Sequence, residues 1–387
     1  MTAKYQPSAL NGHVEFKLPD ISHPSFGKVT ISGRFPRIQP RFSRSEVDPK
    51  IFSGLVSKYT KLVEECGLGT GSFEWAGAIT TTVAAALQFS LYWNPTLALD
   101  STEFTFYVWF ILFAYFYDDG LEDGWFEGKL TVEGWQYASE TYIKIMRMHV
   151  VEDPLPEIEG LPSFHGTCKA LVRMVAAGVE CVGEKYVEYI EPMAHTFQTT
   201  FLSNDWFTSC RLDKRFSLRT YNAWRGWNVA GDGCLEGQLF VRGIPISQNV
   251  RRHPLFKRIM NIVRGNIAWV NDIFSTGKDL TTENYPDNEI LFRVLEKGEN
   301  IHHVVADTCV SNGEELQDLI YLKQTLVDIF GEDDNICGFL EMVDVVIDGQ
   351  LMVYVKTTRY QCDRVYVRVF MDGDEKGQLK LSRQPRN

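Results

Sequence analysis

The stretch FILFAYFYDDGLEDG, residues 110–124, joins an uninterrupted apolar run to a cluster of four acidic residues. The acidic residues are Asp118, Asp119, Glu122 and Asp123. On a helix, their spacing of i, i+1, i+4 and i+5 places them within an arc of about 140°, so they can share one face. Unpaired carboxylates beside a dry core repel one another, whereas Mg²⁺ coordinated by their oxygens would neutralise them. Taken alone, the run fits a metal site and a solvated helix end equally well.

A second stretch, IAWVNDIFSTGKDL at residues 267–280, carries polar residues at every fourth position of an apolar helix. Asn271, Ser275 and Asp279 would form one stripe, with an amide oxygen, a hydroxyl and a carboxylate at successive turns. Oxygen groups of this kind suit one hard cation. Singly, Ser275 could bond back to its own helix and Asn271 could cap a turn. The three together favour a metal site.

Apolar periodicity predicts an all-α protein from residue 49 onward. The expected helices span residues 49–66, 72–92, 101–121, 131–148, 163–185, 187–209, 215–240, 251–276, 284–297, 298–330 and 337–361. No Pro/Gly/Ser-rich or charged linker interrupts them, so residues 49–363 are expected to form one helical domain. Residues 1–48 contain five prolines and little helical periodicity, which predicts an irregular N-terminal arm. Residues 364–387 are expected to be a C-terminal tail, in which RVYVRVF at 364–370 alternates like a strand.

Charge and composition argue against several classes of protein. The 39 Lys and Arg against 50 Asp and Glu give a net charge of −11, and no basic run exceeds a pair, so nucleic-acid binding is not expected. Segment 75–99 is interrupted by polar residues and segment 104–117 is too short for a membrane span, so both predict buried helices. The eight cysteines form no CxxC pair and the start of the chain lacks a signal-like apolar stretch, which indicates a cytoplasmic protein with reduced thiols.

The two stretches resemble the signatures of the class I terpene synthases, most closely those of microbial and fungal sesquiterpene synthases. DDGLED at 118–123 matches the Asp-rich signature DDxx(D/E) or DDxxxD, and NDIFSTGKD at 271–279 matches NDxxSxx(K/R)(D/E). Arg225 stands where the family has a diphosphate-sensing arginine before the asparagine. Arg359 and Tyr360 match the Arg-Tyr pair that follows. Four motifs occur in the order and separation of the family.

This resemblance implies a single-domain helical bundle around a central apolar cavity, and the ionisation of a linear isoprenyl diphosphate. Asp118 would bind two Mg²⁺ ions, with Asp119, Glu122 and Asp123 as further candidate ligands. Asn271, Ser275 and Asp279 would bind a third ion, and Mn²⁺ can substitute. The diphosphate would be held by Arg225, Lys278, Arg359 and Tyr360. Tyr115 is the main candidate for a pocket wall that stabilises the carbocation, and Phe89, Trp93 and Trp224 are weaker candidates.

Farnesyl diphosphate, converted to a cyclic sesquiterpene hydrocarbon or alcohol, is the expected reaction, because the chain has one helical domain and an N-terminal arm like fungal enzymes. A diterpene cyclase acting on geranylgeranyl diphosphate is the first alternative. A chain-elongating prenyltransferase would need a second DDxxD motif, which this sequence lacks. A non-catalytic helical scaffold would not need competent ligands in both motifs. The protein is expected to be a monomer or a homodimer.

Three departures from the family pattern leave details open. Asn228 and Val229 stand where microbial members often have Asp-Gly, so the residue that triggers ionisation after Arg225 is unassigned, although the segment 230–233 could supply the helix break. Val353 replaces a common tryptophan six residues before the Arg-Tyr pair. Asp279 replaces the usual glutamate, which keeps the carboxylate but shortens its reach by one methylene.

Overall fold

The computed structural model describes residues 9–43, 46–68, 76–126, 129–211, 217–281, 288–356, 366–370 and 378–381. Their contacts divide the chain into two compact units. The helical unit comprises Ser43–Asp213 and Gly233–Pro245, and the mixed unit comprises Met1–Phe42, Lys214–Asp232 and Ile246–Asn387. The predicted boundaries of a domain over residues 49–363 stay a prediction.

The helical unit is built from α-helices with one short 3₁₀ turn. Its elements are α1 (Pro49–Glu65), α2 (Ala76–Trp93), α3 (Thr102–Phe126), α4 (Val132–Met146), α5 (Phe164–Val182), the 3₁₀ turn η1 (Gly183–Lys185), α6 (Tyr186–Arg211) and most of α8 (Gly231–Val241). Side-chain hydrogen bonds cap the N-termini of two of these helices, α1 and α4. The Asp48 carboxylate accepts from the backbone N–H of Lys50 at 2.7 Å, and the Thr131 hydroxyl accepts from Gly134 at 3.0 Å.

Helix α3 lies in the interior of this unit, which explains why its sequence has no polar face. Every residue from Phe106 to Phe113 is buried, and the helix packs against both α2 and α5. The ring of Phe113 contacts Tyr142 of α4 at 5.3 Å and Phe197 of α6 at 5.7 Å between centroids. The apolar run of the opening motif is therefore a core helix, as expected.

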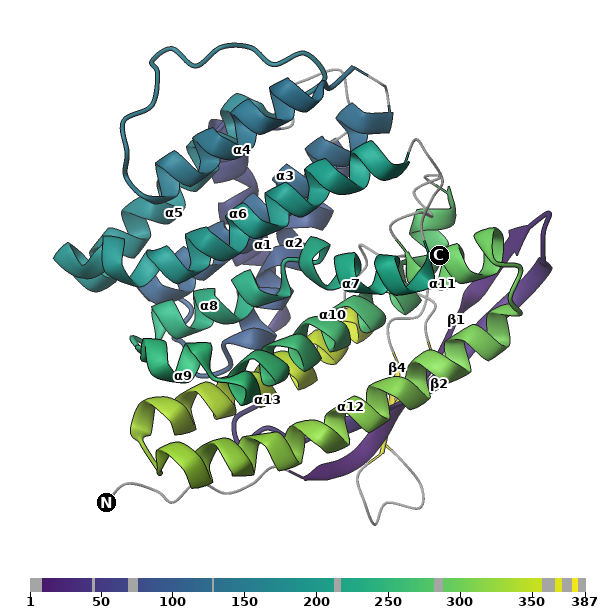
Figure 1. Ribbon diagram of the computed structural model, residues 1–387. Coiled ribbons are helices and arrows are strands. Elements are labelled where there is room, and N and C mark those ends of the chain that lie inside the picture. The colour runs from purple at the N-terminus through teal and green to yellow at the C-terminus, as the bar shows by residue number, and fades with distance from the viewer. Residues whose placement is uncertain are drawn as a thin grey trace. The chain divides into compact units, whose positions relative to one another are not determined.

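The mixed unit combines a four-stranded antiparallel sheet with helices. Its elements are β1 (Leu10–His23), β2 (Gly27–Ile38), α7 (Leu218–Asn228), α9 (Gln248–Arg252), α10 (Pro254–Thr281), α11 (Glu289–Leu291), the π-helical turn η3 (Phe292–Glu296), α12 (Ile301–Phe330), α13 (Asp334–Lys356), β3 (Tyr366–Phe370) and β4 (Gln378–Leu381). The strand order is β2-β1-β3-β4. Strand β2 runs alongside α12 (Figure 1), and α10 packs against both α12 and α13.

The N-terminal segment corrects the expectation of an irregular arm. Residues 10–38 form a long β-hairpin, because Val14, Phe16 and Leu18 alternate on the buried face of β1. The prolines misled the prediction because they occupy tolerated positions. Pro19 lies at an irregularity in the pairing of β1 with β2, and Pro24 lies in the turn between the strands. The strand-like pattern at 364–370 is confirmed for Tyr366–Phe370, which pairs with β1.

The helix expected over residues 215–240 is interrupted. Helix α7 ends at Asn228 and α8 begins at Gly231. Between them Ala230 has a φ of 53°, in the left-handed region that residues with a Cβ rarely adopt. A break is thus present directly after the segment that carries Arg225. The helix expected over residues 284–297 is also wrong in part, because its described residues form the short α11 and the π-helical turn η3, and the expected C-terminal tail supplies strands β3 and β4 of the sheet. The predicted helical fold class is confirmed.

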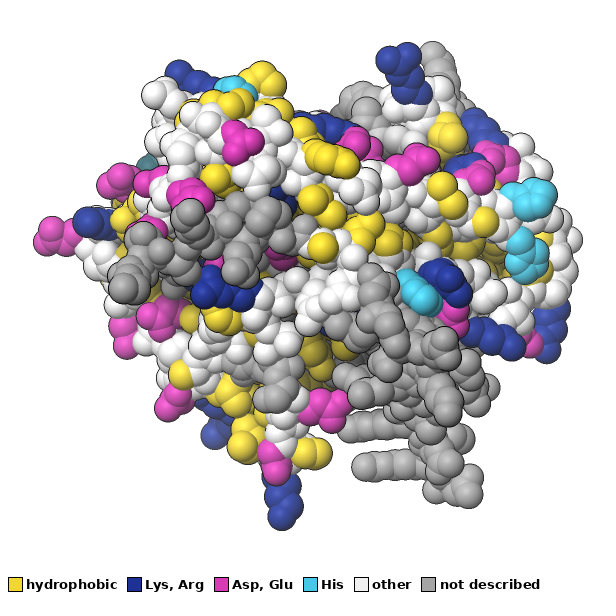
Figure 2. Space-filling view, turned by 90° about the horizontal axis from the view of Figure 1, so that it is seen from below, with side chains coloured by type: hydrophobic (Ala, Val, Ile, Leu, Met, Phe, Trp, Pro, Cys, Tyr) yellow, Lys and Arg dark blue, Asp and Glu magenta, His cyan; other side chains and the backbone are white. Residues whose placement is uncertain are grey.

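The described residues were compared with the requirements of a membrane span and of a basic binding surface. None of their helices combines the length and the hydropathy that crossing a lipid bilayer requires. On the face in Figure 2, the described Lys and Arg side chains are scattered among Asp and Glu side chains and form no continuous basic patch.

Candidate functional site

The guanidinium group of Arg225 connects α7 to α10. Its Nε donates to Asp272 Oδ1 at 3.0 Å and its Nη2 donates to Asn271 Oδ1 at 2.9 Å. A further bond runs from Nη1 to the Asn228 amide oxygen within α7. Arg225 is only 7% exposed, so these bonds hold a charged group inside the unit. The structure therefore brings together Arg225 and Asn271, two residues that the sequence singled out separately.

The main partner of Arg225 is Asp272, which the sequence reasoning did not select. Asp272 is fully buried, and its second carboxylate oxygen accepts from the backbone N–H of Glu289 at 2.8 Å. Burial raises the pKa of Asp272, while the neighbouring Arg225 acts in the opposite direction. A signal was available in the sequence. A carboxylate on the apolar side of a helix needs a cation, and Arg225 was already a candidate.

The proposed metal stripe lies on α10 as expected, and its side chains are largely buried. Ser275 and Asp279 are 2% and 8% exposed, and the Ser275 hydroxyl donates to the Asp279 carboxylate. The Asn271 amide donates to the hydroxyl of Tyr354 on α13, whose ring stacks on Phe274 at 5.4 Å. Tyr354 thus helps to orient Asn271, a role that the sequence did not suggest.

The donor set of this stripe fits a hard divalent cation. Among the described residues, no group of three or more histidine, cysteine, aspartate or glutamate side chains could hold a metal ion. A site on α10 therefore depends on the amide oxygen of Asn271 and the hydroxyl of Ser275 beside the one carboxylate of Asp279. Neutral oxygen ligands of this kind are compatible with Mg²⁺, which commonly keeps waters or substrate phosphates in its shell.

Asn288 is a second residue that the sequence reasoning missed. It caps α11, since its Oδ1 accepts from the backbone N–H of Leu291 at 3.1 Å. Its Nδ2 lies 2.9 Å from Asp279 Oδ2 and 3.2 Å from Ser275 Oγ. An asparagine directly before Glu-Ile-Leu is a recognisable cap in the sequence, but its contact with α10 is visible only in the fold.

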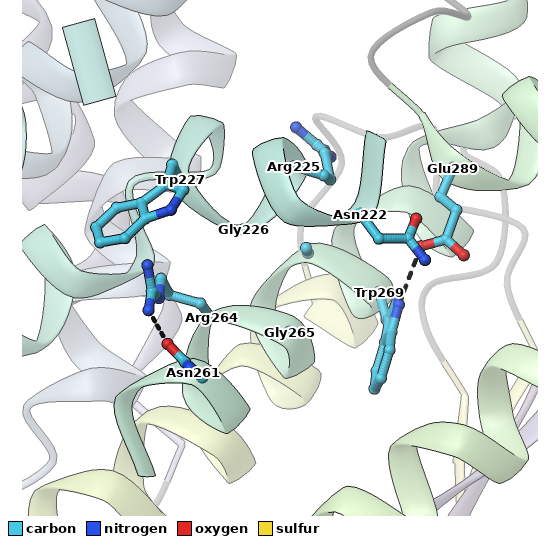
Figure 3. Close-up of a pocket in the computed structure, with 10 residues that line it drawn as sticks. Asn222, Arg225, Gly226, Trp227, Asn261, Arg264, Gly265, Trp269 and Glu289 are labelled. Atoms are coloured by element: carbon cyan, nitrogen blue, oxygen red, sulfur yellow. Dashed lines mark hydrogen bonds between the residues drawn. The ribbon is translucent and has the colours of Figure 1, made fainter. Parts of the chain in front are cut away.

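A pocket of about 390 Å³ adjoins this network between α7, α10 and α11. Its lining includes Asn222, Arg225, Gly226, Trp227, Asn261, Arg264, Gly265, Ala268, Trp269 and Glu289. Figure 3 shows Arg264 beneath the indole of Trp227 at one end and Glu289 beside Trp269 at the other. The guanidinium carbon of Arg264 lies 3.7 Å from the ring centroid of Trp227.

Glu289 has a strongly shifted pKa at the edge of this pocket. Burial, followed by the nearby Asp272, raises the pKa of Glu289 to about 7. The Trp269 indole N–H donates to its Oε2 at 3.1 Å. Asp272 thus accepts from the Arg225 guanidinium through Oδ1 and from the Glu289 backbone N–H through Oδ2, and the Glu289 carboxylate accepts from Trp269.

The acidic motif belongs to the helical unit. Asp118 and Asp119 are half-buried near the end of α3. Glu122 and Asp123 also belong to α3, but their side chains lie outside the described residues. Gly120, between them, allows a close approach, because an added Cβ would lie 2.5 Å from Ser163 Oγ. The predicted ligands thus share one helix, and their roles stay predictions.

The predicted aromatic wall divides between the two units. Phe89 of α2 contacts both Trp93 at 4.8 Å and Tyr115 of α3 at 5.9 Å, edge to face in each pair. Trp224 instead packs against Tyr221 on α7, in the mixed unit. Lys278 is half-buried near the end of α10. Arg359 and Tyr360 lie outside the described residues.

Comparison with known proteins assigns this arrangement to a family. The family described as terpene synthase family 2, C-terminal metal binding, matches residues 108–306, just over half of the chain and including both motifs. The chain belongs to this terpene synthase family.

Individual relatives of this terpene synthase are distant. A (3S,6E)-nerolidol synthase from Selaginella moellendorffii is 27% identical over 123 residues, which cover 31% of this chain and 33% of that protein. The aligned part thus spans about a third of the curated relative. The structure is similar to a single-residue variant of cucumene synthase, with a TM-score of 0.64, 14% identity, and coverage of 84% of this chain and 99% of that one.

Two further solved structures share the fold. Linalool/nerolidol synthase from Streptomyces clavuligerus has a TM-score of 0.61 at 11% identity and covers 80% of this chain and 96% of its own. Germacradien-4-ol synthase from Streptomyces citricolor has a TM-score of 0.59 at 12% identity, with coverage of 82% and 97%. At these identities the likeness concerns the fold of this terpene synthase alone.

Proposed function

We propose that this terpene synthase ionises farnesyl diphosphate in a Mg²⁺-dependent reaction and cyclises it to a cyclic sesquiterpene hydrocarbon or alcohol, with release of diphosphate. One observation carries the proposal. Asn271, Ser275 and Asp279 form a stripe of oxygen groups on α10 in which Ser275 and Asp279 are buried, and Arg225 donates to the Asn271 amide oxygen. A hard cation site beside a fixed guanidinium suits a substrate with a diphosphate group.

The metal ligands are proposed in two sets. Asn271, Ser275 and Asp279 would hold one Mg²⁺, and Asp118, with Asp119, Glu122 and Asp123, would hold two more. When bound, Mg²⁺ neutralises the diphosphate and makes it a better leaving group. The acidic net charge of −11 is then no obstacle to an anionic substrate.

Arg225 would bind and orient the diphosphate, with Lys278, Arg359 and Tyr360 as further contacts. Its bonds to Asp272 and Asn228 fix the guanidinium in place before any ligand arrives. A pre-positioned cation loses little side-chain freedom on binding an anion, so more of the interaction energy remains for stabilising the developing charge. The break at Ala230, directly after α7, is the proposed structural counterpart of the trigger segment.

Tyr115, Phe89 and Trp93 are the proposed wall for the carbocation within the helical unit. Their rings already meet edge to face, which holds each face in a defined direction. A ring face attracts a nearby cation through its quadrupole, and an apolar lining keeps water from quenching it. Trp224 stays a weaker candidate, because its described ring contact is with Tyr221 in the mixed unit.

The proposal is tested by incubating the purified protein with geranyl, farnesyl and geranylgeranyl diphosphates, with and without Mg²⁺. Gas chromatography with mass spectrometry of the hexane extract identifies C10, C15 or C20 products, with nerolidol included as a standard. A C15 product formed only with Mg²⁺ is the expected result. A C20 terpene would make the protein a diterpene synthase, and a longer prenyl diphosphate in the aqueous phase would make it a prenyltransferase.

Failure to convert any of these substrates would favour the non-catalytic scaffold. Asp118→Ala and Asn271→Ala are the matched variants, one from each motif, and each is expected to nearly abolish turnover. Wild-type-like turnover in either variant would refute its metal assignment. The cytoplasmic location and the monomeric or homodimeric state stay predictions.

A further inference from the structure

The side chain of Asn288 connects the start of α11 to three acceptor atoms on α10. Its Nδ2 lies 2.6 Å from the backbone oxygen of Asp272, 2.9 Å from Asp279 Oδ2 and 3.2 Å from Ser275 Oγ. Asn288 is fully buried, so no water competes for its amide. We propose that Asn288 is a positioning residue for the metal stripe, setting the orientation of Ser275 and Asp279. This inference rests on the proposed function, because it assumes that the stripe binds a divalent cation.

The orientation of the Asn288 amide is fixed at both ends. Its Oδ1 accepts from the backbone N–H of Leu291 at 3.1 Å, which requires the Nδ2 group to face α10. An NH₂ group has two hydrogens, and here three oxygens surround it, so the hydrogen bonds are shared among them. Asn288 is therefore held as a donor toward the stripe and cannot turn its oxygen there without losing the α11 cap.

The bonds of Asn288 constrain two of the three proposed ligands. Asp279 Oδ2 accepts from both the Ser275 hydroxyl and the Asn288 amide. A carboxylate with two donors on one oxygen has a fixed rotamer, so its approach to a cation is also fixed. Mutation of a residue that hydrogen-bonds to a metal ligand and orients it typically lowers metal affinity by about 10- to 100-fold.

A purely structural role for Asn288 would be the capping of α11, and one substitution separates the two roles. Asn288→Ser keeps a side-chain oxygen able to cap, since serine and asparagine are comparable N-caps. The shorter side chain has no amide to donate to Asp279 and Ser275. The matched control is Asn300→Ser. Asn300 caps α12 by accepting from the backbone N–H of His302 at 3.0 Å and of His303 at 3.3 Å.

The test is Mn²⁺ binding measured by the electron paramagnetic resonance signal of free Mn²⁺, in the presence of inorganic diphosphate. Wild type, Asn288→Ser, Asn300→Ser and Asn271→Ala are compared as full-length proteins. Asn288→Ser is expected to raise the apparent Kd for Mn²⁺ by about 10- to 100-fold, whereas Asn300→Ser leaves it unchanged. Thermal unfolding without metal shows whether each variant is folded.

The outcomes separate the inference from the proposed function. Wild-type affinity in Asn288→Ser, together with loss of binding in Asn271→Ala, would overturn the positioning role alone. Wild-type affinity in Asn271→Ala would overturn the metal assignment itself.

Asn288→Thr is the second variant, used if Asn288→Ser does not fold. It keeps a side-chain oxygen able to cap α11 but has no amide to donate to Asp279 and Ser275. Mn²⁺ should therefore raise its Tm less than it raises that of wild type. An equal rise would contradict the inference.

Discussion

Helices α3 and α10 carry the two motifs, and they bury their side chains in different ways. Helix α3 is surrounded by aromatic rings, and Asp118 and Asp119 come at the end of the buried run. Helix α10 buries the polar side chains of Asp272, Ser275 and Asp279, and each bonds to a residue of another element. The apolar helix can be recognised from composition alone, whereas the polar stripe depends on residues that are distant in sequence.

The largest effect on stability is expected when the buried pair of Arg225 and Asp272 loses one partner. Asp272→Ala leaves Arg225 buried without its carboxylate, which should lower the free energy of unfolding by about 3–5 kcal/mol. Denaturant unfolding of Asp272→Ala, Arg225→Met and the double variant measures the coupling. The double variant should cost less than the two single changes together, because it leaves no uncompensated charge. Additive costs would show that Arg225 and Asp272 do not depend on each other.

The second effect is a dependence of the unfolding free energy on pH, and it comes from Glu289, whose carboxylate accepts from Trp269 on α10. The pKa of Glu289 is raised to about 7 in the folded protein from 4.5, so the folded state binds the proton more tightly. Stability from this group is present below pH 4.5 and is lost as pH rises through about 7, by roughly 3 kcal/mol in all.

Comparison of wild type with Glu289→Gln measures this loss directly. Unfolding free energies at pH 5 and pH 8 should show wild type losing stability relative to the variant as pH rises. An unchanged difference between the two proteins at both pH values would mean that Glu289 is ionised throughout this range in the fold.

The third effect tests close packing around α3. Gly178 of α5 faces this helix, and an added Cβ would lie 2.5 Å from the Tyr186 ring and 3.0 Å from the Phe106 ring. Gly178→Ala should therefore destabilise the protein by about 1–3 kcal/mol, since rigid rings must move. Gly54→Ala in α1 is the control, because nothing lies within 4 Å of its added Cβ. That control should be neutral or stabilising by up to about 1 kcal/mol. Equal costs at both glycines would contradict the packing described for α3.

The smallest effect concerns the hydroxyl that supports Asn271. Tyr354→Phe removes the acceptor of the Asn271 amide and should cost about 1 kcal/mol in unfolding free energy. Tyr59→Phe removes a longer bond, from Tyr59 to Thr105 at 3.4 Å, and should cost less. The order of the two costs, measured by thermal unfolding, is the prediction, and a reversed order would contradict it.

The sequence predicted the helices better than the contacts between them. The start of α1 and the span of the α3 core follow from local caps and apolar composition, which depend on neighbouring residues. The hairpin at 10–38 was missed because Pro19 and Pro24 look like breakers of regular structure, and only the pairing shows that they lie at an irregularity and a turn. The helix break was expected in segment 230–233, which contains two glycines, but the left-handed conformation of Ala230 itself is visible only in the structure.

The candidate site was predicted in part for the same reason. The stripe of Asn271, Ser275 and Asp279 follows from helical periodicity, and Arg225 was found through a family resemblance. Asp272 and Asn288 act through partners on other elements, so a one-dimensional pattern gave them no distinct role. Neither is a metal ligand in the predicted scheme, but Asp272 holds the Arg225 guanidinium and Asn288 donates to the predicted ligands Ser275 and Asp279.

The most direct test of the account is the release of diphosphate from farnesyl diphosphate, measured against Mg²⁺ concentration for wild type and Asn271→Ala. The account predicts that wild type releases diphosphate only when Mg²⁺ is present. In Asn271→Ala, release should be nearly abolished at every Mg²⁺ concentration. Metal-independent release by wild type, or wild-type-like release by Asn271→Ala, would contradict it.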